Sequence, residues 1–174
     1  MSAPGRTIAC FGCGAQVTAI DGPTHAYILS APGCWERYGE VLAAELSEPA
    51  RWPAHQLSVD AYAVQHPSNP DRRNRQSVAV HLVSLCLLLE RQLPPERAPV
   101  LRAALLEARR TWGFPSLDPL PAPATRTVVD VAGASSPAEH VERVRRWATS
   151  AWQAWDHHHD VVRAWADEIC PCGA

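Results

Sequence analysis

The sequence has 174 residues, of which 47% are hydrophobic and 20% are charged, and its formal net charge at pH 7 is −2. This length suits one domain with a buried core, and the composition is globular rather than disordered. Without a concentrated basic face, we expect no nucleic-acid partner. All 16 lysine-plus-arginine positions are arginine, which excludes mechanisms that need a lysine, such as a Schiff base.

No segment of the sequence predicts membrane insertion. The first residues, Met1 to Arg6, lack the apolar stretch of a signal peptide. The most apolar run, Val78 to Leu89, is about 12 residues long, whereas a membrane helix needs about 20. We therefore expect a cytoplasmic protein whose cysteines are reduced and free to bind metal.

In chain order, residues 1–31 are rich in glycine, proline and threonine, which predicts an irregular segment. Residues 32–112 predict four helices. The first has Pro32 in its opening turn, and the second ends at His66, before Pro67. The polar stretch 67–75, with three arginines, is interpreted as a solvated loop. The third helix, about 76–92, is apolar on nearly every side and is expected at the centre of the fold.

Residues 113–135 are rich in proline and predict a loop, and residues 136–169 predict one long helix. That helix opens with a capping box at Ser136 and Glu139. It would span about 48 Å, against a radius of gyration of about 16 Å for a compact chain. We expect it to bend, to project or to form a homo-oligomer with a second copy. Residues 1–174 are thus predicted to be a single all-α domain, an antiparallel bundle of four to five helices with an N-terminal zinc knuckle.

The knuckle is the segment from Cys10 to Gly14, whose Cys-x-x-Cys-Gly spacing lets two thiolates face one ion. Zinc takes four ligands, so two more must come from elsewhere in the chain. Two alternatives remain open. His25 and Cys34 lie in the same N-terminal part of the chain, whereas Cys170 and Cys172 would join its two ends. Cys86, inside the apolar third helix, is expected to be a core thiol.

Several polar residues fall at predicted interior positions, where they must be satisfied. The candidates for a catalytic site are Asp60, His66, His81 and His158. Each is interpreted either as a satisfied core residue or as one ligand of a metal held between facing helices. No Glu-x-x-His pair is present, so the di-iron pattern of ferritin-like bundles is not met.

The sequence resembles a family of small bacterial proteins known only as a domain of unknown function. The resemblance covers nearly the whole chain. It rests on the motifs C-x-G-C-G from Cys10, D-G-P-T-H-x-Y from Asp21, G-C-W from Gly33 and H-x-L-x-V-D-A-Y-x-x-Q-H-P from His55. It implies no activity, but it favours His25 and Cys34 over the C-terminal cysteines as partners of the knuckle.

Three functions are compatible with the sequence. The first is a zinc-binding helical module with a binding or accessory role. The second is a metal-dependent hydrolase or transferase with a His/Asp site in the core. The third is a metal sensor or carrier that uses the cysteines and the run from His157 to His159. A second metal in the core would separate the first two, and rapid metal exchange would favour the third.

Overall fold

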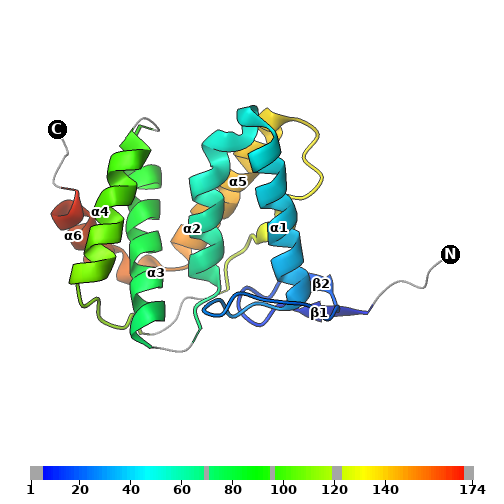
Figure 1. The fold of residues 1–174 in the computed structure, drawn as a ribbon, viewed down its shortest axis with the longest axis horizontal. Coiled ribbons are helices and arrows are strands. Elements are labelled where there is room, and N and C mark those ends of the chain that lie inside the picture. The colour runs from blue at the N-terminus through cyan, green and yellow to red at the C-terminus, as the bar shows by residue number, and fades with distance from the viewer. Residues whose placement is uncertain (1–5, 69–70, 95–96, 119–122, 171–174) are drawn as a thin grey trace.

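The computed structural model describes residues 6–68, 71–94, 97–118 and 123–170. This part of the chain contains six α-helices and one two-stranded antiparallel sheet (Figure 1). The prediction of a mainly helical protein is confirmed, whereas a regular antiparallel bundle stays a prediction. The helices are α1 (Pro32–Ser47), α2 (His55–Gln65), α3 (Arg72–Leu85), α4 (Ala98–Thr111), α5 (Pro137–Gln153) and α6 (His159–Ile169).

The N-terminal segment was expected to be irregular, but part of it forms a β-hairpin. Strands β1 (Thr7–Ala9) and β2 (Gln16–Thr18) pair with Ile8 opposite Val17. Val17 is buried, and the hairpin lies at the N-terminal end of α1 (Figure 1). Both cysteines of the knuckle therefore lie between two paired strands, in a turn that the helices hold in place.

Helix α2 packs against α1, α3 and α5, and α3 packs against α4 and α6. In Figure 1 the helices α1, α2, α3 and α4 stand side by side, with α5 behind α2. As predicted for the third helix, Leu82 and Leu85 have no solvent exposure and Val80 is buried. Leu88 is only partly buried, because it follows the end of α3 in a π-helical turn, Cys86–Glu90.

Helix α3 begins earlier than the sequence predicts. Asp71 is its N-cap, and its side chain accepts a hydrogen bond from the Asn74 amide at 2.8 Å. The arginines expected in a solvated loop therefore lie in the first turn of a helix. Among its described residues, the predicted proline-rich loop contains a short 3₁₀ helix, Val128–Asp130, which opens with a capping box at Thr127.

The predicted long C-terminal helix is interrupted between α5 and α6 by a 3₁₀ turn, Asp156–His158. The predicted cap at Ser136 is present, at 3.2 Å from the Glu139 amide. At the break, the ring of His159 stacks on Trp152 and its Nε2 lies 3.0 Å from the Trp152 carbonyl oxygen. The bend accommodates the length of this segment within one chain.

Candidate metal centre

Cys10 follows β1 directly, and Cys13 lies in the turn that leads to β2. The turn is closed by two backbone hydrogen bonds, from Cys10 to the Ala15 carbonyl at 2.8 Å and from Gly14 to the Cys10 carbonyl at 3.0 Å. Gly14 has φ +74°, a conformation that glycine adopts without steric cost. The turn brings both sulfurs to the inner side of the hairpin, where both cysteines are buried.

Cys34 lies in the first turn of α1 and has no solvent exposure. The residue before it, Gly33, touches the hairpin so closely that a Cβ there would lie 2.2 Å from the Thr18 carbonyl oxygen. Glycine at this position therefore lets the start of α1 contact β2. The Sγ of Cys34 lies 3.8 Å from the Sγ of Cys13.

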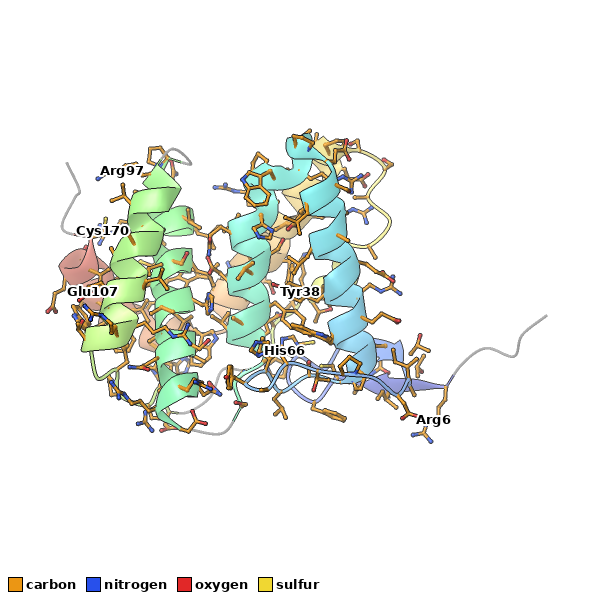
Figure 2. All side chains as sticks on the ribbon, viewed as in Figure 1. Arg6, Tyr38, His66, Arg97, Glu107 and Cys170 are labelled. Atoms are coloured by element: carbon orange, nitrogen blue, oxygen red, sulfur yellow. The ribbon has the colours of Figure 1, made fainter. Side chains whose placement is uncertain are left out.

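His66 supplies the fourth group from the C-terminal end of α2 (Figure 2). Its Nδ1 lies 2.7 Å from the Tyr62 carbonyl oxygen, which fixes Nδ1 as the donor and leaves Nε2 to face the cysteines. The Nε2 atom lies 3.5 Å from the Sγ of Cys34. The turn of the knuckle closes over the ring, because a Cβ on Gly12 would lie 2.7 Å from the Cδ2 of His66.

The ligand atoms of Cys10, Cys13, Cys34 and His66 all lie within 4.8 Å of one another, and all four residues are buried. This group could hold a metal ion. Backbone and side-chain donors surround it. The Ala31 amide donates to the Cys10 sulfur at 3.4 Å, and the Tyr62 hydroxyl donates to the Cys34 sulfur at 3.7 Å.

Without a metal ion, the close contacts within the group shift the pKa values of Cys10, Cys34 and His66. Hydrogen bonds from Cys13 and Cys34 hold the pKa of the Cys10 thiol far below its usual value, which leaves a thiolate. The pKa of Cys34 is raised, because its hydrogen bonds to Cys10 and Cys13 favour the thiol. Burial lowers the pKa of His66, but hydrogen bonds to Cys10 and Cys13 outweigh it and raise that pKa to about 9. Metal binding would displace these protons.

His25 does not join the group, so the structure brings His66, and not the predicted His25, beside Cys10, Cys13 and Cys34. The His25 side chain is exposed and packs against the rings of Tyr27 and Trp35. Its Nδ1 accepts a hydrogen bond from the Tyr27 amide at 3.3 Å, so the ring is directed along its own loop and not toward the knuckle. The other alternative is not formed either, because Cys170 lies at the end of α6 outside the group. Cys172 lies outside the described residues.

The remaining catalytic candidates do not form a second metal site in the described ranges. The Asp60 carboxylate is fully buried and accepts hydrogen bonds from His81 Nδ1 at 2.7 Å, Ser84 at 2.5 Å and Gln56 at 2.9 Å. His158 is half-buried beside the Trp155 ring and is not a partner of this carboxylate. Asp60 and His81 are therefore a satisfied pair, the alternative that the sequence left open.

A second buried carboxylate, Glu45 on α1, was missed by the sequence analysis. It is 1% exposed and lies 2.9 Å from His55 Nδ1, 2.5 Å from the Ser58 hydroxyl and 3.0 Å from His140 Nε2. The contacts connect α1, α2 and α5. The signal in the sequence was its helical spacing, because Glu45 lies four and seven residues after Val41 and Tyr38, which are both buried on α1.

A protein-family model described as a family of unknown function (DUF5946) matches residues 8–156. This range contains all four residues of the candidate metal centre. Comparison with curated proteins and comparison with solved structures found no match. In the part of the chain that the structure describes, no helix has the length and apolar character needed to cross a membrane.

Proposed function

The chain belongs to the DUF5946 family of unknown function, and we propose from its own residues that Cys10, Cys13, Cys34 and His66 hold a structural zinc ion. Three thiolates and one imidazole are a donor set that zinc prefers. Four protein ligands leave no open position for a substrate or an activated water. The ion then serves the stability of a binding or accessory module and not a reaction.

The spacing of the ligand atoms supports zinc. With Zn–S bonds of about 2.3 Å and a Zn–N bond of about 2.0 Å, a tetrahedral ion separates two sulfurs by about 3.8 Å and a sulfur from a nitrogen by about 3.5 Å. The distance from Cys13 Sγ to Cys34 Sγ is 3.8 Å, and that from Cys34 Sγ to His66 Nε2 is 3.5 Å. This agreement is the observation that carries the proposal.

The ion would join three elements that already touch one another, since α2 packs against α1 and β2 contacts α1. The hairpin β1–β2 is short, and isolated two-stranded hairpins are at best marginally stable. A metal that binds the hairpin, the start of α1 and the end of α2 fixes all three, and its binding free energy contributes to folding. The alternative of a metal-dependent hydrolase or transferase would need a further ligand beside Asp60 and His81, and the described residues bring none there.

Elemental analysis of protein purified without a histidine tag tests the proposal. We expect one equivalent of zinc in the wild-type protein and its loss in Cys13→Ser. The matched control is Cys86→Ser, since Cys86 is also buried but lies at the end of α3 outside the group. Zinc retained in Cys13→Ser, or lost equally in Cys86→Ser, would contradict the proposal.

A further inference from the structure

A groove between α3 and α4 contains two cavities that share part of their walls. One has a volume of about 120 Å³ and is lined by His81, Asp60 and apolar residues of α4. The other has a volume of about 430 Å³ and is lined by arginines of both helices. Leu106 and Arg109 line both cavities. The two cavities therefore adjoin along α3 and α4, which pack side by side (Figure 1), and together we call them the groove.

The smaller cavity has one polar wall and one apolar wall. On the polar side, His81 donates its Nδ1 proton to the buried Asp60 carboxylate at 2.7 Å. That hydrogen bond fixes the tautomer and leaves Nε2 as a hydrogen-bond acceptor. The His81 side chain is 24% exposed, so a ligand can reach it. Leu101 and Leu105 form the apolar wall.

The larger cavity is strongly positive. Arg72 and Arg73 lie in the first turn of α3, and Arg109 and Arg110 lie in the last turn of α4. Glu107 neutralises Arg110, with contacts down to 2.8 Å. Arg73 donates to the Tyr27 hydroxyl.

Within the described ranges, no acidic side chain pairs with Arg72 or Arg109. Their guanidinium groups are therefore available to an anion. Arginine is the side chain best suited to bind phosphate through paired hydrogen bonds.

We propose that this groove binds a small phosphorylated molecule, with its phosphate on Arg72 and Arg109 and a hydroxyl of its body on His81. Arg72 and His81 are nine positions apart, which corresponds to about 13 Å along α3. The phosphate and the hydroxyl must therefore lie at opposite ends of the ligand, and the long arginine side chains cover part of this distance, as Arg109 does by lining both cavities. The volume beside His81 is well below the roughly 300 to 1,000 Å³ of drug-sized pockets, so the body is of about the size of a sugar.

Neither end of the groove depends on the zinc ion. The candidate metal ligands lie at the hairpin, at the start of α1 and at the end of α2, whereas the groove is formed by α3, α4 and one face of α2. The zinc proposal and the groove proposal can thus fail separately.

Calorimetric titration of the wild-type protein with ribose 5-phosphate, inorganic phosphate and ribose tests the proposal. We expect ribose 5-phosphate to bind most tightly and ribose not to bind measurably. Arg72→Gln combined with Arg109→Gln should weaken both phosphate-containing probes by about tenfold or more. The control Arg145→Gln, an exposed arginine of α5, should leave the affinities unchanged.

Two further variants locate the body of the ligand. His81→Gln keeps a donor beside Asp60 and should weaken ribose 5-phosphate but not inorganic phosphate. Leu106 is 59% exposed at the junction of the two cavities, so Leu106→Glu should fold normally and repel both anions. The proposal is overturned if neither phosphate probe binds, if the arginine double variant binds as well as the wild type, or if His81→Gln changes neither affinity. Tighter binding of a ten-nucleotide single-stranded DNA than of ribose 5-phosphate would also overturn it.

Discussion

The Nε2 atom of His66 lies 3.5 Å from the Sγ of Cys34, although 32 residues separate them in the chain. One residue ends α2 and the other begins α1. The second nitrogen of the same ring is held by the Tyr62 carbonyl oxygen at 2.7 Å. An imidazole fixed in this way is prepared to bind a metal before any metal arrives.

The first prediction distinguishes the two histidines that the sequence offered. His66→Ala should weaken zinc binding by a factor of about ten to 100 or more, because it removes a ligand from a buried group. His25→Ala should leave the affinity unchanged, since His25 is exposed and contacts Tyr27 and Trp35 instead. Competition with a chromogenic chelator measures both. Equal losses in the two variants would return His25 to the ligand set.

The second prediction concerns the glycines of the knuckle. A Cβ on Gly12 would lie 2.5 Å from the Leu29 carbonyl oxygen and 2.7 Å from His66 Cδ2, so Gly12→Ala must displace the turn from His66. A Cβ on Gly14 meets nothing within 4 Å, and Gly14→Ala introduces only the strain of a positive φ, about 1 kcal/mol. We expect Gly12→Ala to lose most of its zinc and Gly14→Ala to keep it.

Elemental analysis measures the zinc content of Gly12→Ala and Gly14→Ala. Thermal unfolding of the two variants is a second measurement. Full zinc content in Gly12→Ala would show that the turn does not need to approach His66 so closely.

Local patterns in the sequence were enough to predict the helices and the cysteine pair. Apolar periodicity, a proline at the first helical position (Pro32) and the cap at Ser136 act within one or two turns of chain, and the structure has helices there. The Cys10-x-x-Cys13 spacing is equally local. The early start of α3 is hard to predict, because Asp71, a standard N-cap residue, and the arginines that follow it form a polar stretch typical of a loop.

Local sequence patterns could not predict which distant residues meet in the metal centre and in the groove, because those contacts form only when the helices pack. His66 was recognised as an interior candidate, but only the packing of α2 against the hairpin places it beside Cys34. His25 looked equally suitable because it lies closer in sequence. Likewise, two arginines of α3 and two of α4 converge only once those helices pack side by side.

The third prediction concerns the buried carboxylate of Glu45. Glu45→Ala leaves His140, whose side chain is 3% exposed, without its partner at 3.0 Å, and it also leaves the Ser58 hydroxyl unpaired. We expect a loss of about 3 kcal/mol or more in the free energy of unfolding. Glu40→Ala on the same helix removes only an exposed pair with Arg37 and should cost less than about 1 kcal/mol. Urea unfolding of the two variants is the measurement, and equal costs would contradict a structural role for the Glu45 contacts.

The fourth prediction is a pH dependence of stability that originates at Glu90. Its carboxylate accepts hydrogen bonds from Arg163 at 2.8 and 2.9 Å and from Trp152 Nε1 at 3.1 Å, and so connects the end of α3 to α5 and α6. The Arg163 contact, partly opposed by desolvation, lowers the pKa of Glu90 from 4.5 to about 2. Because the folded-state pKa is depressed, this contact stabilises the protein fully above pH 4.5, and its contribution is lost as the pH falls toward 2.

Urea unfolding between pH 6 and pH 2 should therefore show the wild type losing more stability than Glu90→Gln below pH 4.5, until the two converge near pH 2. The difference should not exceed about 1 kcal/mol, because both partners of the pair are partly exposed. Arg163→Gln removes the cause of the depressed pKa and should abolish the same difference. Acid also releases zinc, but that loss is common to all three proteins and cancels when they are compared at the same pH. If the free energies of unfolding of the wild type and Glu90→Gln fall in parallel between pH 4.5 and pH 2, the Arg163 contact does not lower the pKa of Glu90 in solution.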